Sequence, residues 1–193
     1  MALPQELPML ERRPVRLRPW RDDDVPIVRE VADDPLIPLI TTVPTSGRHD
    51  DAMEWIARQH ERMVTGYGYA FAIADLETDA PVGHIILRTH EVQHGRAGVG
   101  YWIAKRYRRK GYAAAALRLI TDWADTIDEI GRVELHVEPQ NEGSWRAAED
   151  AGYQREGLLR AYQRIGAERY SMWVYSHVPD RDWEVEQEEV PED

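Results

Sequence analysis

A basic cluster followed by small residues occupies positions 104–117, AKRYRRKGYAAAAL. Five cations fall in six positions: Lys105, Arg106, Arg108, Arg109 and Lys110. Apolar residues recur at three- and four-residue steps after Gly111, which predicts that a helix begins there. The first turn of a helix offers unpaired N–H groups and a partial positive charge to an anion. Gly111 and Ala113 would let a phosphate approach that backbone, and the cations would surround it with positive charge.

The same cluster could instead be a solvated patch or a contact with nucleic acid. The chain carries a formal net charge of −11, which disfavours nonspecific binding to nucleic acid. The cluster lacks the second glycine and the Lys-Ser/Thr pair of a Walker loop, and it lacks the three spaced glycines of the dinucleotide fingerprint. Its position between an expected strand and an expected helix favours a phosphate site of another kind.

A second chemical pattern, HEVQH at His90–His94, matches the H-E-x-x-H sequence of zinc peptidases. That chemistry requires a helix, which directs both imidazoles and the catalytic Glu to one metal. The preceding segment VGHIILRT has the character of a strand, and Gly95 and Gly98 follow the motif. We therefore expect a hairpin loop without a metal site, and the zinc peptidase stays a remote alternative.

The elements that must position these residues form a mixed α/β (α+β) pattern, in the order β-α-α-β-β-β-α-β-α-β-β. Helices are expected at 24–32, 49–63, 111–131 and 141–152. Strands are expected at 15–20, 69–75, 82–89, 96–104, 133–137 and in a closing hairpin around Gly166. We predict a mixed, mostly antiparallel, twisted sheet of about seven strands with about four flanking helices.

Length and composition favour one domain at 15–179, between an N-terminal extension at 1–14 and an acidic tail at 180–193. The tail holds eight acidic residues against Arg181, a net charge of −7, and is expected to be disordered. The absence of Cys excludes disulfides and thiolate metal sites. The chain starts without the pattern of a signal peptide and has no stretch near the roughly 18 apolar residues of a membrane span. We expect a cytoplasmic protein without membrane contact.

Two motifs, in order, resemble the GNAT superfamily of N-acetyltransferases. RRKGYA at 108–113 fits its Arg/Gln-x-x-Gly-x-Gly/Ala loop, and NEGSWRAAEDAGY at 141–153 is similar to its second motif, Asn-x-x-Ser with Gly eight residues later. With VRLRPWRDDD at 15–24, the resemblance covers nearly the whole folded part. It extends to the branch that includes ribosomal-protein alanine N-acetyltransferases. It implies the GNAT fold, acetyl-CoA as cosubstrate and no metal.

The resemblance also assigns contacts to acetyl-CoA. A strand bulge that frees backbone N–H groups in the family would here involve Trp102, Ile103 and Ala104. The pyrophosphate would be held by Arg108, Arg109, Lys110, Gly111, Tyr112 and Ala113, and the 3′-phosphate would be reached by Arg106 or Arg109. Asn141 would bond the pantetheine arm, and Ser144 would protonate or stabilise the departing thiolate. Asn141 and Ser144 also suit helix capping, which does not exclude contact with the cofactor.

The catalytic residues are less completely assigned. Many GNAT enzymes have a Tyr four residues beyond the Ser position, where this chain has Ala148, so Ser144 is the preferred acid. Glu134 and His136 share one face of the strand VELHV, and either could act as the base. His136 has a suitable unperturbed pKa, yet it could equally be a core histidine. Some members carry a Glu near Gln163, and since Gln accepts no proton, a water relay to Glu134 or His136 is expected.

We predict an acetyl-CoA-dependent N-acetyltransferase that acts on a primary amine by direct attack in a ternary complex. The amine is a protein N-terminus or a small molecule, and its contacts are expected from residues 36–55 and from the last hairpin. The mildly acidic body would suit a cationic acceptor. An alternative is a nonenzymatic acyl-CoA-binding or regulatory protein, because Ala115, Ala148 and Gln163 depart from the family pattern. A homodimer is compatible with this branch.

Overall fold

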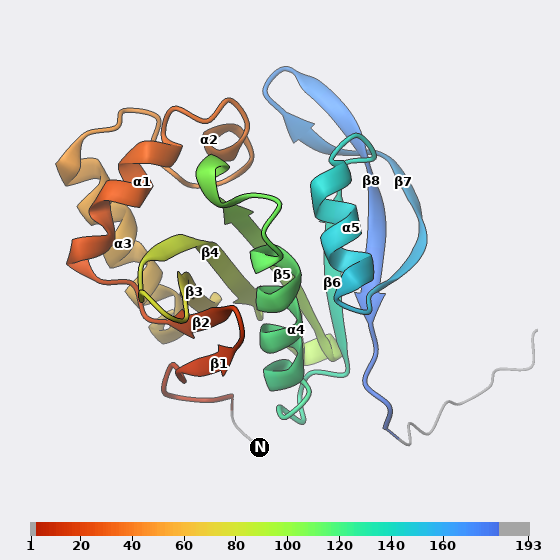
Figure 1. Cartoon of the computed structure of the whole chain (residues 1–193). Coiled ribbons are helices and arrows are strands. Elements are labelled where there is room, and N and C mark those ends of the chain that lie inside the picture. Colours follow the sequence, from red (N-terminus) through yellow and green to blue (C-terminus); the bar gives the residue numbers. More distant parts are fainter. Residues whose placement is uncertain (1–2, 182–193) are drawn as a thin grey trace, which may run out of the picture.

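The computed structural model describes residues 3–181, which contain an eight-stranded sheet in the order β1-β2-β3-β4-β5-β6-β8-β7 (Figure 1). The strands are β1 (Leu10–Arg12), β2 (Val15–Arg18), β3 (Gly68–Asp75), β4 (Pro81–Arg88), β5 (Arg96–Ile103), β6 (Arg132–Val137), β7 (Gln154–Ile165) and β8 (Glu168–His177). The α-helices are α1 (Val25–Val31), α2 (Ile37–Ile40), α3 (His49–Val64), α4 (Tyr112–Ala124) and α5 (Glu142–Asp150). The 3-10 turns are η1 (Asp22–Asp24), η2 (Val92–His94) and η3 (Lys105–Tyr107).

The predicted fold class is confirmed, with differences at the ends of elements. The additional strand β1 lies within the segment assigned to an N-terminal extension and pairs antiparallel with β2. The short helix α2 was not expected. Helix α4 ends at Ala124, whereas the apolar pattern predicted an end near Gly131. The segment after Ala124 forms single hydrogen-bonded turns, which still bury Ile127 and Ile130. The apolar spacing therefore continues beyond the α-helical hydrogen bonds. The tail predicted at 180–193 lies outside the described residues except for its first two positions.

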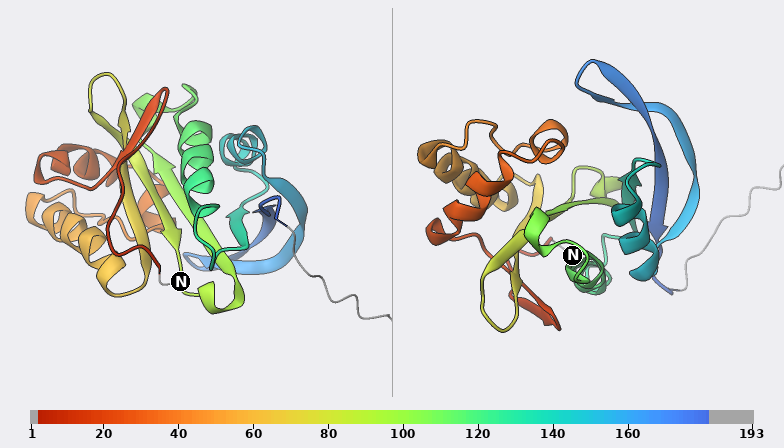
Figure 2. Two further views of the ribbon diagram at one scale, coloured as in Figure 1. Left: turned by 90° about the horizontal axis from the view of Figure 1, so that it is seen from below. Right: turned by 45° about the horizontal axis from the view of Figure 1, so that its top comes forward.

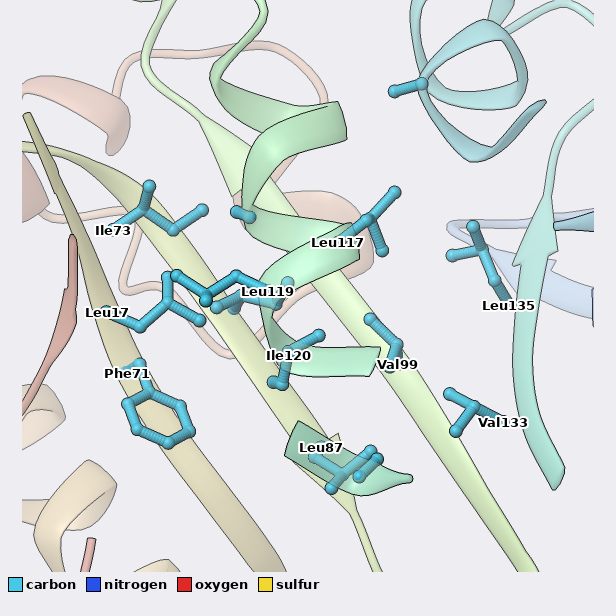
Figure 3. Packing of buried hydrophobic residues seen from close by; sticks show 14 of the residues in the cluster. Leu17, Phe71, Ile73, Leu87, Val99, Leu117, Leu119, Ile120, Val133 and Leu135 are labelled. Carbon is cyan, nitrogen blue, oxygen red and sulfur yellow. The ribbon is translucent and has the colours of Figure 1, made fainter. Parts of the chain in front are cut away.

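Helices cover both faces of the sheet, with α4 on one side and α1 and α3 on the other in the left view of Figure 2, and each face buries its own hydrophobic cluster. On one face, Leu117 and Ile120 of α4 pack against strand residues such as Phe71 and Val99 (Figure 3). On the other face, α1 and α3 enclose a cluster around Trp55. Burying one large apolar side chain contributes roughly 1.5–3 kcal/mol. This packing holds α4, and hence its N-terminus, in a fixed position on the sheet.

The parallel strands β5 and β6 separate after a short contact. They pair only across Arg96–Gly98 and Arg132–Glu134. Beyond that point β5 stays with β4 as far as Ile103, and β6 stays with β8 as far as Val137. In Figure 1 the two strands lie together at one end and diverge toward the other. The other neighbouring strands pair antiparallel. The β5–β6 pair is parallel and covers only three residues of each strand, so the sheet opens between these two strands.

The edge strand β7 is long, exposed and irregular. Its register with β8 shifts between Arg155 and Gly157 and again between Leu159 and Gln163. Residues 154–162 are all exposed. The β7–β8 hairpin curves beyond α5 toward α2 in Figures 1 and 2.

The HEVQH segment is a turn that continues into η2. The expected hairpin loop is confirmed, and no α-helix presents the two imidazoles to a common metal. Across residues 3–181 no helix has both the length and the apolar character needed to cross a membrane.

Candidate active site

The divergence of β5 and β6 opens a cleft with a cavity of about 450 Å³. Its walls come from β5, β6, the first turn of α5, the segment around α2, and the β7–β8 hairpin. The lining residues include Val99, Gly100, Tyr101, Trp102, Leu135, His136, Val137, Glu138, Asn141, Ser144, Leu39, Ile40, Thr41, Thr42, Gln163 and Met172. Both regions expected to contact the acceptor therefore contribute to the cavity.

The backbone of β5 directs main-chain groups toward this cleft. β5 keeps a regular antiparallel register with β4, in which Ala104 N–H donates to Val82 O at 3.0 Å. Successive residues of a strand point their N–H groups to opposite sides, so those of Tyr101 and Ile103 face the side that β6 has left. The expected bulge from Trp102 to Ala104 is therefore wrong. N–H groups are instead freed by the departure of β6, at Tyr101 and at Ile103, of which the prediction included only Ile103.

Of the three residues assigned to that bulge, one reaches the cavity with its side chain. Trp102 lines the cavity and packs with Trp20 and Trp55, and its indole N–H has no hydrogen-bond partner among the described residues. Ile103 and Ala104 are buried in the two hydrophobic clusters.

The basic cluster forms a loop that ends at the N-terminus of α4. Arg109 and Gly111 both have left-handed backbone conformations, with φ of 61° and 79°. The first helical hydrogen bond runs from Ala115 N–H to Gly111 O, so the preceding N–H groups have no intrahelical acceptor. No side chain caps this end. Tyr112 fixes the first turn by donating its hydroxyl to Asp75 at 2.7 Å. The open N-terminus is suited to an anion, as predicted from the sequence.

The five cations of the loop have different roles. Arg106 pairs with Glu30 at 3.0 Å. Arg108 pairs with Asp34 at 2.6 Å and also donates to Ile103 O at 2.9 Å, which ties the loop to the end of β5. Of the loop's five cations, Lys105, Arg109 and Lys110 make no ion pair with a described residue, and all three are exposed. Direct contact of Arg108 with a phosphate stays a prediction, because its guanidinium already holds the loop.

Ser144 lies in the first turn of α5 and contacts a tyrosine that sequence reasoning missed. The Tyr101 hydroxyl lies 2.8 Å from Ser144 Oγ and 3.2 Å from Ser144 O. Burial raises the pKa of Tyr101 to about 12, so the phenol keeps its proton at neutral pH. The Asn141 side chain accepts a hydrogen bond from Ser144 N–H, which confirms the expected cap. Asn141 and Ser144 cap the helix and line the cavity at the same time.

Residues 15–154 match the family model described as the acetyltransferase (GNAT) domain. The chain belongs to the GNAT family of acetyltransferases. It is 25% identical over 160 residues to the uncharacterized N-acetyltransferase p20 of Bacillus licheniformis, a match that covers 83% of this chain and 90% of p20. These relationships confirm the predicted family and the predicted class of enzyme.

Solved structures of low sequence identity share this GNAT fold. Mycobacterium smegmatis RimJ, solved in complex with CoA-disulfide, has a TM-score of 0.78 and 22% identity, over 92% of this chain and 90% of RimJ. A Salmonella typhimurium acetyltransferase described as modifying the N-terminal serine of ribosomal protein L7/L12 has a TM-score of 0.74 and 16% identity. That match covers 88% of this chain and 97% of the Salmonella protein.

The two candidate bases of this GNAT enzyme lie in different surroundings. His136 lines the main cavity and an adjoining cavity of about 350 Å³, and burial lowers its pKa. Glu134 lines only the adjoining cavity and pairs with Arg132 at 2.6 Å. Ser144 and His136 therefore share the main cavity, whereas Glu134 is separated from Ser144 and engaged in an ion pair.

A second histidine in the wall of the main cavity, His84, was not identified from the sequence. Its Nδ1 accepts a hydrogen bond from Trp20 Nε1 at 3.2 Å, which fixes the ring among buried tryptophans. Burial lowers its pKa to about 3, and the positive charge of Arg62 acts in the same direction. His84 thus stays neutral, and its engaged Nδ1 makes it a structural residue of the cavity wall.

Proposed function

We propose that this GNAT enzyme transfers an acetyl group from acetyl-CoA to a primary amine by direct attack within a ternary complex. The observation that carries the proposal is the separation of β5 and β6 beside two helix N-termini, those of α4 and α5. Tyr101 and Ser144 give the cavity a hydroxyl pair, N–H groups of β5 face the gap left by β6, and the anion site at the N-terminus of α4 follows the end of β5 along the chain.

The cleft suits the chemical parts of acetyl-CoA in turn. The open N-terminus of α4, with Lys105, Arg109 and Lys110 nearby, suits the phosphates. The N–H groups of Tyr101 and Ile103 suit the pantetheine and the thioester oxygen, whose negative charge grows during attack. RimJ supports this assignment, because it has the same fold and was solved with a CoA derivative.

Acetyl transfer requires a proton for the departing sulfur and removal of one from the amine. As the amine nitrogen bonds to the acetyl carbon, the carbon–sulfur bond breaks and CoA leaves as a thiolate. We assign Ser144 as the donor that protonates or stabilises this thiolate, with Tyr101 donating to Ser144 Oγ behind it. Tyr101 thereby takes the place of the tyrosine absent at Ala148, which makes the nonenzymatic alternative unnecessary.

The amine must lose a proton, and His136 is the better candidate to receive it. Burial keeps the imidazole of His136 neutral and able to accept a proton, directly or through a water molecule. Glu134 is held by Arg132 and is assigned an electrostatic role on His136, whose pKa it raises against the effect of burial.

The test is thiol release from acetyl-CoA with a panel of primary amines, together with thermal stabilisation by acetyl-CoA. We expect Ser144→Ala and Tyr101→Phe each to lower kcat by roughly 100-fold or more, the usual contribution of a positioned acid. The double variant should lose little beyond the worse single variant, because the two hydroxyls act in series. Tyr170→Phe, which removes a hydroxyl bonded to Glu168 outside the cavity, should match the parent. Absence of both thiol release and stabilisation would refute the proposal.

A further inference from the structure

Arg88, the last residue of β4, brings a guanidinium to the boundary between the two cavities. It pairs with Gly98 in the sheet and lines both cavities. Glycines on β5 make room for it, since a Cβ at Gly100 would come within 3.2 Å of Arg88 Nη1 and one at Gly98 within 3.4 Å of Nε. The sequence of β5 thus provides a flat surface on which this side chain lies across the strand.

This guanidinium is largely buried and has few partners. Its one hydrogen bond to a described residue runs from Nη2 to Val99 O at 3.3 Å, and it makes no ion pair within residues 3–181. A guanidinium carries several N–H donors and stays charged in proteins. Burial lowers the pKa of Arg88. Tyr67 raises this pKa, whereas the positive charge of Arg62 lowers it further. A buried cation without a carboxylate is costly unless a ligand supplies the counter-charge.

A second arginine without a carboxylate partner faces the main cavity. Arg62 of α3 donates to Gln59 Oε1 at 2.7 Å and to Thr42 Oγ1 at 3.3 Å, and its guanidinium lies 4.5 Å from the ring centroid of Tyr67. These contacts fix its position without neutralising it. Two positive charges are thus held on one cavity wall and repel each other, which an anion between them would relieve.

The acidic residues of the two cavities do not neutralise these arginines. Glu138 accepts a hydrogen bond from Gln140 at 2.8 Å, and burial raises its pKa. In the adjoining cavity, Glu91 pairs with Arg96 at 3.5 Å and Glu134 pairs with Arg132. Among the residues that line the main cavity, Arg62 and Arg88 outnumber Glu138, so the charge there is opposite to that of the whole chain, which favoured a cationic acceptor.

We propose that the acceptor amine carries a carboxylate, which Arg88 binds through its free N–H donors with Arg62 beside it. The proposal rests on the N-acetyltransferase activity proposed above. It names the substrate class as small amino acids or related amino carboxylates. A phosphate has similar recognition chemistry, so the experiment separates the two anions.

The experiment compares matched acceptors that differ only in the anionic group. The pairs are β-alanine with β-alaninamide, glycine with glycinamide, and phosphoethanolamine with ethanolamine. We expect kcat/KM to be roughly 10- to 100-fold higher for the carboxylate member, the range that a charge-assisted hydrogen bond gives. A preference confined to the phosphate pair, or equal rates within every pair, would overturn the proposal.

Variants locate the source of that preference. Arg88→Gln should remove most of the difference within the carboxylate pairs, and Arg88→Lys should keep part of it. Arg58→Gln is the matched control, because Arg58 is exposed one turn from Arg62 on α3 and lines neither cavity. An unchanged preference in Arg88→Gln would contradict the assignment. If Arg88→Gln does not fold, Arg88→Lys and Arg62→Gln provide the same comparison.

A binding measurement separates this inference from the proposed function. Glutarate has two carboxylates and no amine, so its affinity for the acetyl-CoA-bound protein can be measured by calorimetry without catalysis. We expect binding that weakens at least tenfold in Arg88→Gln and stays unchanged in Arg58→Gln. Binding of glutarate without acetylation of any amine would refute the enzymatic proposal alone. Acetylation of amines without binding of glutarate would refute the carboxylate site alone.

Discussion

His84 should make the free energy of unfolding unusually sensitive to mild acid. The imidazole is buried among tryptophans, which lowers its pKa from the ordinary 6.5 to about 3 in the folded protein. In the unfolded chain it takes up a proton as the pH falls through 6.5, while in the folded protein it stays neutral. The contribution of His84 is therefore present above pH 6.5 and is lost progressively toward pH 3.

The size of the effect follows from these two pKa values. Between pH 7 and pH 5 the unfolded state gains about 2 kcal/mol relative to the folded state from this one group. Carboxylates whose pKa lies near 2 in the folded protein, such as Asp75 and Glu156, add to acid sensitivity mainly below this interval. Between pH 7 and pH 5 the lowered pKa of His136 acts in the same direction, so a His84 variant is needed to separate the part that is due to His84.

Urea unfolding at pH 7, 6 and 5 measures the effect, with His84→Asn as the test variant. The Asn side chain can still accept the hydrogen bond from Trp20, but it has no proton to gain. We expect its free energy of unfolding to fall by about 2 kcal/mol less than that of the parent between pH 7 and 5. His60→Asn, at an exposed position of α3, should follow the parent. An equal decline in His84→Asn and the parent would refute the reasoning.

Three further predictions concern the loop, the salt dependence and the first helix. Gly111→Ala should lower the free energy of unfolding by roughly 1–2 kcal/mol, because φ is 79° at this position. It should also weaken acetyl-CoA binding, measured by calorimetry. The control is Gly143→Ala, at a helical position with open space around it. The Kd for acetyl-CoA should rise between 50 and 500 mM NaCl, chosen as roughly a tenfold range, since the unpaired cations of the loop are exposed. Asp24→Asn should lower the free energy of unfolding by about 3 kcal/mol in urea, because it leaves the buried guanidinium of Arg18 without its bidentate partner; an effect below about 1 kcal/mol would contradict this.

The sequence predicted the features that depend on local periodicity. The helix after Gly111, the strand of His136 and the cap at Asn141 follow from residues close together in the chain, and all are present. The divergence of β5 and β6 depends on which neighbour each strand keeps, and periodicity contains no such information. The bulge at Trp102–Ala104 was expected from the family resemblance, and the regular register of β5 with β4 does not contain it.

Two site residues were missed because their surroundings are assembled from distant segments. Tyr101 lies two residues from Val99 and two from Ile103, on the same face of β5, so its pattern is that of a core residue, and only the fold brings Ser144 to its hydroxyl. Arg88 follows an apolar strand and resembles an ordinary solvent-exposed end. The glycines spaced two apart on β5 were the available signal, since they imply that something lies closely against that strand.

The exposed strand β7 bears on how the molecule avoids aggregation through its sheet edge. A long edge strand with free backbone groups can pair with another chain and lead to aggregation. Here the two register shifts and the positive φ of Ala161 break the edge into short pieces, and Arg155, Arg160 and Arg164 add positive charge along it. A variant without these irregularities would have a straighter β7–β8 hairpin, and its regular edge would make the protein less soluble.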